Sequence, residues 1–247
     1  MLSKQMTAVL ALLGGAGAGD RSGGLADAAA VAAAAALGVD GIAAGMMGTG
    51  AEGIVLPWGR WGRQEASAAL EDAQFTLGQG PCVEALADGS PVLVADLAAA
   101  TARWPAFTPA AAALGVGAVF AFPLRIGAIS VGVLWAHRAA AGPLSVQQLA
   151  DALALADAVT VLLVHQAIPG NGTPGARPSS PYPGWAAPST YRAQVHQATG
   201  MISVQLDVGL AEALVRLRAR AYAEDRRVAE VADDVVSRRL RFDEPEP

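Results

Sequence analysis

The segment between residues 167 and 189 most constrains what this chain can fold into. It contains six prolines and four glycines. Proline removes a backbone hydrogen-bond donor, and glycine loses more conformational entropy than any other residue when it is ordered. We therefore expect neither helix nor strand here. We interpret the segment as an extended linker that divides the chain of 247 residues into two folding units.

The unit before the linker, residues 25–166, alternates helical and strand-like patterns, which predicts an α+β fold. Two runs rich in Val, Ile and Phe, 116–126 and 128–137, meet at Gly127 and predict an antiparallel hairpin. We expect an antiparallel sheet flanked by helices. The predicted helices span 25–37, 64–74, 104–114 and 145–166, and the predicted strands span 41–47, 53–58, 91–94, 116–126 and 128–137.

The unit after the linker, residues 190–242, shows helical patterns alone. Helices are predicted over 190–205, 210–223 and 228–238, which makes a three-helix bundle. Apolar residues at helical spacing mark the core-facing side of the second and third helices. They are Leu210, Leu214, Leu217 and Ala221 in the second helix, and Val228, Val231, Ala232 and Val235 in the third. A bundle this small has a small core and is marginally stable alone.

The two ends of the chain carry weaker patterns. Lys4 and the apolar run at 8–13 have the outline of a signal peptide, but the run is shorter than usual. We interpret residues 1–24 as a frayed N-terminal segment and expect a cytoplasmic protein. No stretch approaches 18 uninterrupted apolar residues, so we expect no membrane contact. Residues 243–247 form an acidic tail.

The composition argues against an enzyme. The body of the chain has no lysine for a Schiff base or a phosphate-binding loop, because Lys4 is the single lysine. Cys82 is the single cysteine, and the three histidines lack metal-ligand spacing. The Gly-x-Gly-x-x-Gly match at 48–53 leads into a strand-like run, which indicates a hairpin turn. We expect no catalysis, no cofactor, no metal, and a buried, unreactive Cys82.

Arginine is concentrated in the last fifth of the chain. Residues 191–242 hold nine arginines and seven acidic residues, whereas the whole chain has a net charge of −5. This modest local excess suits a small anionic partner surface better than long tracking along duplex DNA. One hypothesis is a solvated helix surface with ion pairs to Glu212 and Asp234. The other is a phosphate-contacting surface on which His196 and Tyr222 stack on unpaired bases.

The C-terminal unit resembles an ANTAR domain. The matching runs are VHQATGM at 195–201, LAEALVRLR at 210–218 and VAEVA at 228–232, and the family's Ala-Lys-Gly signature is Ala198-Thr199-Gly200 here. The resemblance implies a bundle that binds RNA hairpins in nascent transcripts and acts in transcription antitermination. The candidate RNA-binding residues are His196, Thr199, Arg218, Arg220, Tyr222, Arg226, Arg227, Arg238 and Arg239.

The N-terminal unit looks like a GAF domain of the kind joined to ANTAR domains in actinobacterial regulators. The resemblance covers about residues 25–166 and implies a small-molecule sensor or a dimerisation module, so we expect a homodimer and an unidentified ligand. The matching runs are LEDAQFTLGQGPC at 70–82, PVLVADL at 91–97, RWP at 103–105, FPLRIGA at 122–128 and VGVL at 131–134.

Together the two resemblances predict a signal-responsive, RNA-binding regulator of transcription antitermination. The GAF unit would sense a signal or hold a dimer, and the ANTAR bundle would contact RNA. Thr199, in place of the family's lysine, leaves an alternative open. In that alternative, the chain is a GAF-type sensor or protein-interaction scaffold whose C-terminal bundle does not bind RNA.

Overall fold

The computed structural model describes residues 2–16, 24–47, 55–62, 64–167, 190–224 and 226–242. Three features discussed above involve residues that the structure does not describe. The predicted linker beyond Ala167, the acidic tail at 243–247 and the glycine-rich match at 48–53 all lie outside the described residues.

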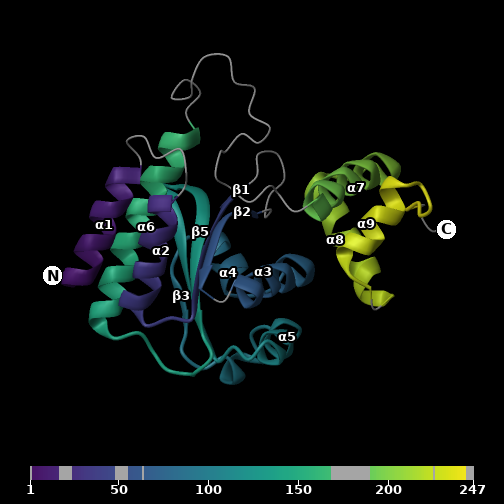
Figure 1. Ribbon diagram of the computed structural model, residues 1–247. Helices are drawn as coiled ribbons and strands as arrows, with labels where there is room; N and C mark the ends of the chain where they lie inside the picture. Colours follow the sequence, from purple (N-terminus) through teal and green to yellow (C-terminus); the bar gives the residue numbers. More distant parts are fainter. Residues whose placement is uncertain are drawn as a thin grey trace, which may run out of the picture.

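A five-stranded antiparallel sheet forms the centre of the N-terminal unit (Figure 1). The strands lie in the order β2-β1-β5-β4-β3. They are β1 (Gly41–Met47), β2 (Val55–Gly62), β3 (Val92–Val94), β4 (Ala118–Ile126) and β5 (Ile129–Arg138). Each predicted strand is confirmed to within a few residues. The β4–β5 hairpin turns at Gly127, whose φ of 59° is a conformation that glycine adopts without strain.

Different helices cover the two faces of the sheet (Figure 1). One face carries α1 (Lys4–Ala16), α2 (Gly24–Leu37) and α6 (Val146–Ala167), and the other carries α3 (Gln64–Leu77), α4 (Pro81–Asp88) and α5 (Phe107–Ala113). Side chains alternate along a strand, so each strand contributes to both cores. Phe120 and Phe122 pack beneath α1, α2 and α6, whereas Val119 and Ala121 pack beneath α3, α4 and α5. The predicted α+β fold is confirmed.

The N-terminal segment is helical and packed, which corrects the prediction that it is frayed. α1 begins after Ser3, whose side-chain oxygen accepts a hydrogen bond from the backbone N–H of Met6 at 3.0 Å. Met6, Val9 and Leu13 are buried in the core shared with α2 and α6. The backbone N–H of Ser3 also donates to the carboxylate of Asp151 in α6, at 3.0 Å. The sequence pattern did not show that α2 and α6 provide a surface on which these three apolar residues pack.

The helix α4 is an element that the sequence interpretation missed. Pro81 lies in its first turn, and Gly89, with a φ of 63°, ends it. Proline at a helix start and glycine just past a helix end are the usual boundary residues, so the signal was present in the sequence. The predicted helix at 104–114 is confirmed in shorter form as α5, which follows the short 3₁₀ turn at Ala98–Ala100.

The helix α6 is long and apolar enough, by length and composition, to cross a membrane. Its segment Val146–Val164 has a mean hydropathy of 1.4. In the fold, Leu155, Val159 and Leu163 of this helix are buried in the core against α1, α2 and the sheet. Burial within the domain therefore accounts for part of its apolar character, whereas Leu153 and Val161 of the same helix are exposed.

The C-terminal unit is a bundle of three helices, α7 (Thr190–Leu206), α8 (Leu210–Ala223) and α9 (Val228–Val236). Its core joins Val195 and Ile202 of α7 to the buried faces of α8 and α9. The predicted face of α9 is buried throughout, and that of α8 is buried except for Leu210, at the helix start. The predicted break between α7 and α8 is confirmed at Asp207, which has a φ of 51°. The bundle lies on the α3 side of the sheet (Figure 1).

Candidate functional site

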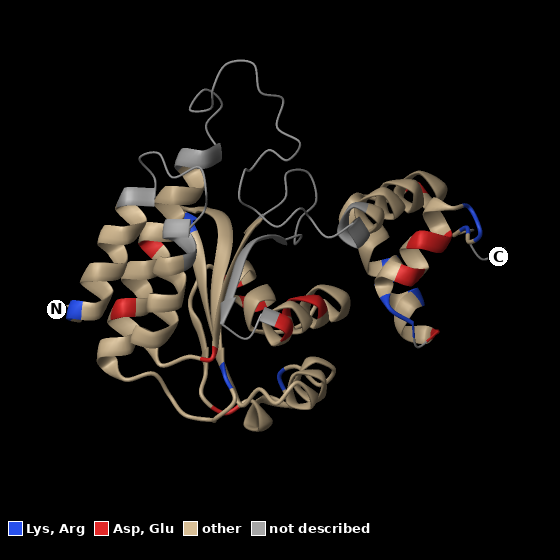
Figure 2. Ribbon diagram, viewed as in Figure 1, with Lys and Arg blue, Asp and Glu red and all other residues tan. Residues whose placement is uncertain are grey.

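Basic and acidic residues lie close to one another along the C-terminal bundle (Figure 2). Most of its described arginines, which lie on α8 or just before and after α9, pair with acidic side chains of the same bundle. Arg216 of α8 lies 2.9 Å from Glu212, one turn earlier, and Arg220 pairs with Glu224. Arg227 lies 2.6 Å from Glu230. These pairs confirm the prediction that part of the arginine surface is a set of local ion pairs. Exposed pairs of this kind contribute little to stability, about 0–1 kcal/mol each.

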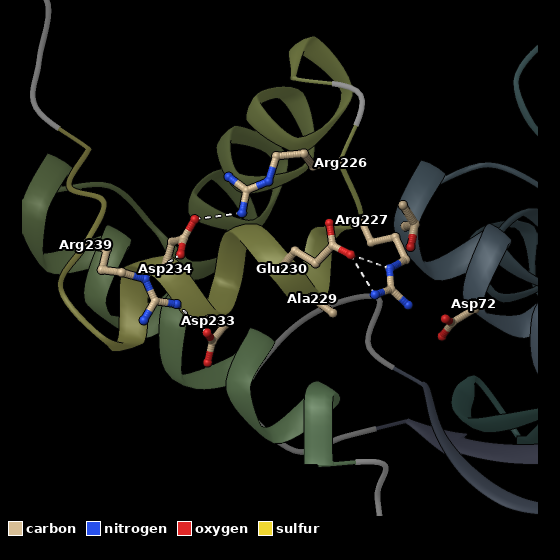
Figure 3. A pocket seen from close by; sticks show the side chains of 9 residues that line it. Asp72, Arg226, Arg227, Ala229, Glu230, Asp233, Asp234 and Arg239 are labelled. Carbon is tan, nitrogen blue, oxygen red and sulfur yellow. Dashed lines mark hydrogen bonds and ion pairs between the residues drawn. The ribbon is translucent and has the colours of Figure 1, made fainter.

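A second group of ion pairs is centred on Asp234 of α9. Its carboxylate lies 2.7 Å from a guanidinium nitrogen of Arg226 and 2.7 Å from one of Arg239 (Figure 3). Hydrogen bonds from these two arginines hold the pKa of Asp234 below its ordinary value, and they raise the pKa values of both arginines. The charges of Arg226 and Arg239 are therefore largely compensated inside the bundle.

Arg238 and Arg241 differ from the other C-terminal arginines. Both are exposed, and within the described residues neither forms an ion pair. They border a groove of about 730 Å³ along α7, with Gln197, Gly200, Met201, Val204 and Gln205 as its other lining residues. No acidic side chain of the described residues lines this groove. It therefore combines two arginines without an acidic partner among the described residues, amide groups and the apolar side chains of Met201 and Val204, and we call it the α7 groove.

The structure moves Thr199 out of the candidate RNA surface. Its side chain is 1 % exposed, and its hydroxyl donates to the backbone carbonyl of Val195 at 2.7 Å. A hydroxyl in that position cannot reach a phosphate. The prediction that Thr199 takes part in RNA contact is wrong, because α7 turns this position toward the bundle core, and the motif by itself gave no orientation.

We expect Thr199→Lys to destabilise the bundle by about 1–3 kcal/mol, because the ammonium group must be buried or must displace neighbouring side chains to reach water. Thr199→Val is the matched control, since it keeps the shape and removes only the hydroxyl. Urea unfolding of the full chain, followed through the bundle's transition, measures both changes. Unchanged stability of Thr199→Lys would contradict the burial of this position.

Arg218 is the second correction. The sequence placed it on an exposed flank of α8, but its guanidinium lies over the ring of Phe75 in α3, 5.3 Å from the ring centroid. Burial lowers the pKa of Arg218 to about 10. In this arrangement Arg218 is half-buried, and its Nε atom is closed to solvent.

The two aromatic candidates occupy different environments. Tyr222 lies near the end of α8 and is 78 % exposed, so its ring is free to stack on an unpaired base. His196, on α7, is half-buried and adjoins Gln197 of the α7 groove in sequence. Of the nine candidate RNA-binding residues, Arg238 is the one that lines the α7 groove. The sequence prediction did not include Arg241 or the α7 side chains among the binding residues. Met201 and Val204 were the sequence features that could have indicated this side of α7.

The interior of the N-terminal unit contains a second group of polar side chains, beneath α3. The hydroxyl of Ser67 and Nε2 of His137 on β5 lie 2.9 Å apart, and both residues are fully buried. They approach closely because residue 41 is a glycine: a Cβ there would lie 2.3 Å from Nε2 of His137. The arrangement ties α3 to the sheet through a buried hydrogen bond.

Two further polar atoms in this layer are unsatisfied. The indole N–H of Trp135 and the hydroxyl of Thr108 are buried and have no hydrogen-bond partner within the described part of the chain. An unsatisfied buried polar group costs about 1–3 kcal/mol, so such groups favour a bound water or ligand that pairs with them. This layer is therefore the candidate ligand site of the N-terminal unit.

Cys82 at the start of α4 is buried, as predicted. Its backbone N–H donates to the side-chain oxygen of Gln74 at 2.7 Å, and the amide nitrogen of Gln74 lies 3.3 Å from the sulfur. Burial raises the pKa of the Cys82 thiol well above its ordinary value. The thiolate is the reactive form of cysteine, so a raised pKa makes Cys82 unreactive. Its hydrogen bonds with Gln74 connect α3 to the start of α4.

Comparisons with known proteins agree with this architecture. No curated protein matches the chain. A GAF domain from an Acinetobacter phosphoenolpyruvate-protein phosphotransferase matches with a TM-score of 0.50 and 12 % identity, over 70 % of this chain and 100 % of that one. The free methionine-R-sulfoxide reductase of Neisseria meningitidis, in complex with its substrate, matches with a TM-score of 0.47 and 16 % identity, over 68 % of this chain and 96 % of that one. Because the family model for the GAF domain matches residues 23–163, the chain belongs to the GAF domain family.

Proposed function

We propose that this protein is a cytoplasmic, signal-responsive RNA-binding regulator that acts in transcription antitermination. Its GAF domain, a sensor and signalling domain, would receive the signal. The C-terminal bundle, residues 190–242, would bind RNA hairpins. The resemblance of the bundle to ANTAR domains motivates the RNA target, and the α7 groove supports it.

The observation that carries the proposal is that Arg238 and Arg241, beside the α7 groove, form no ion pair with any acidic residue that the structure describes. An arginine that is already paired must break its ion pair to bind a phosphate, whereas these two need only shed water. The amide side chains of Gln197 and Gln205 add hydrogen-bonding groups that suit base edges. Tyr222 adds an exposed aromatic ring.

On the sensor side, two observations support a ligand and a dimer. The unsatisfied Trp135 and Thr108 groups offer hydrogen bonds to a small polar molecule. Val31 of α2 and Leu153 and Val161 of α6 are exposed apolar side chains on the opposite helical layer, which suits contact with a second copy of the chain.

The double substitution Arg238→Gln/Arg241→Gln should weaken binding of the full chain to a transcript hairpin. It should also flatten the salt dependence of log K by about 0.7–0.9 for each phosphate that the protein no longer binds. Glutamine keeps much of the side-chain length, and folding should be unaffected because both residues are exposed. Affinities measured at several salt concentrations test this expectation.

The matched control is Arg216→Gln/Arg227→Gln, which removes the same charge from two ion-paired positions. It should change the salt slope much less than the substitution at the groove. Equal effects of the two pairs would show that net charge alone governs binding. No RNA binding by any variant would favour the alternative, a GAF sensor or protein-interaction scaffold, which the many internal ion pairs of the bundle already permit.

A further inference from the structure

The outer side of α3 contributes an aromatic side chain to the core of the C-terminal bundle. Phe75 is 6 % exposed, and it belongs to the buried core of the bundle, which includes Val195 and Leu214, and not to the core beneath α3. Without the bundle this phenylalanine would lie on the surface of the GAF domain. It is therefore the anchor of a contact between the two units.

Arg218 of α8 meets the same surface. Its guanidinium lies over the Phe75 ring, and a guanidinium nitrogen lies so near Gly78 that a Cβ on that glycine would be 3.1 Å away. The Nε atom of Arg218 is buried and has no hydrogen-bond partner in the described residues. A cation–π contact compensates a desolvated guanidinium in part. In this position the Phe75 ring covers one face of the Arg218 guanidinium, and its Nε atom is closed to solvent.

The rest of the contact is charged and loosely packed. A pocket of about 470 Å³ separates Asp72 and Thr76 of α3 from Arg227, Ala229 and other residues around α9. Asp72 lies across this pocket from Arg227 (Figure 3). Contacts between domains that are small, polar and open are the ones that separate readily.

The helix α3 faces the sensor interior as well as the bundle. Its inner side carries Ser67, which hydrogen-bonds to His137, and Gln74, which hydrogen-bonds to Cys82 at the start of α4. Its outer side carries Asp72, Phe75 and Thr76. A change in the polar layer beneath α3 would therefore act on the same rigid helix that holds the bundle.

We propose that α3 is a docking surface for the C-terminal bundle of the same chain, and that docking through Phe75 withholds Arg218 from RNA. The masking part of this inference rests on the proposed function of the bundle. Release of the bundle exposes Arg218 beside the rest of the arginine surface, where it can bind a further phosphate. A signal that destabilises the docked state shifts the population toward the RNA-competent state.

Cross-linking tests docking independently of RNA. In the full chain, Thr76→Cys and Ala229→Cys together place two thiols in the pocket between the units. A short bis-maleimide should join them, and peptide mass spectrometry should identify the 76–229 link. Adding Phe75→Ser should lower the yield at least about fivefold, whereas Val83→Ser, the same kind of change at an exposed apolar residue of α4, should not. Chains with one of the two cysteines control for reaction at Cys82.

RNA binding tests masking. Phe75→Ser should tighten binding of the full chain to a transcript hairpin about fivefold. It should also steepen the salt slope of log K by about 0.7–0.9, because the released Arg218 binds one more phosphate. Arg218→Gln added to Phe75→Ser should return the slope to that of the unsubstituted chain. Val83→Ser should leave both quantities unchanged.

The two experiments separate the possible failures. A 76–229 link that is absent, or that is insensitive to Phe75→Ser, overturns docking. A link that depends on Phe75, together with RNA affinity and slope that do not change, overturns masking. If the link depends on Phe75 and no variant binds RNA, docking stands, and the proposed RNA function fails together with masking.

Discussion

Leu217→Ala should unfold the C-terminal bundle and leave the GAF domain folded. Leu217 is 0 % exposed and lies in the centre of the core between α7, α8 and α9. Removing a buried leucine side chain costs about 2–5 kcal/mol, since the cavity does not fully collapse. A core of about 50 residues rarely supplies more than about 3–5 kcal/mol in total, so the bundle cannot absorb this loss.

Hydrogen exchange, measured on individual peptides by mass spectrometry, reports on the two units of the full chain separately. Peptides from 194–242 should lose protection in Leu217→Ala, while peptides from β4 and β5 keep it. Val215→Ala, on the same helix but 58 % exposed, is the control and should change stability by less than about 0.5 kcal/mol. Full protection of α8 in Leu217→Ala would mean that the buried face of this helix has been assigned wrongly.

Gly132→Ala should destabilise the GAF domain by about 3 kcal/mol, at the upper end of the usual cost of overpacking. Gly132 lies on the central strand β5, opposite Met46 of β1 and Leu124 of β4. A Cβ at this position would lie 2.2 Å from the carbonyl oxygen of Gly45. That oxygen belongs to the backbone of a paired strand, so relief requires β1 and β5 to separate.

Thermal and urea unfolding of the full chain measure this change. Gly14→Ala is the control, because Gly14 is exposed on α1 and a Cβ there has nothing within 4 Å. In a helix interior this exchange should stabilise the protein by up to about 1 kcal/mol. If Gly132→Ala behaved like Gly14→Ala, the close approach of β1 to β5 would be excluded.

The helix α3 contributes residues to the core of the GAF domain and to the core of the C-terminal bundle. The inner side of α3 covers the layer that holds the unsatisfied Trp135 and Thr108 groups, and its outer side contacts the bundle through Phe75. This arrangement needs no rigid connection through residues 168–189, since the two units touch directly. In the docking that we propose, a proline- and glycine-rich connection would keep the bundle near α3.

Elements with strong local signals were predicted from the sequence alone. The strands β4 and β5 follow from β-branched and aromatic runs around Gly127, and α9 follows from four apolar residues at helical spacing. These features depend on interactions within a few residues, so a single sequence contains them. By contrast α1 required the surfaces of α2 and α6 before its three apolar residues had anything to pack against.

The properties of individual site residues were decided by the tertiary structure. The sequence shows arginines at 218, 226, 238, 239 and 241, on the second helix, in the turn after it and around the end of the third helix. Which of them keep a free charge depends on the acids that other turns and helices bring within 4 Å, as Asp234 does for Arg226 and Arg239. Phe75, 143 residues before Arg218 in the chain, covers that guanidinium. Helical spacing determines neighbours along one helix, whereas the packing of separate elements determines which charges remain in water.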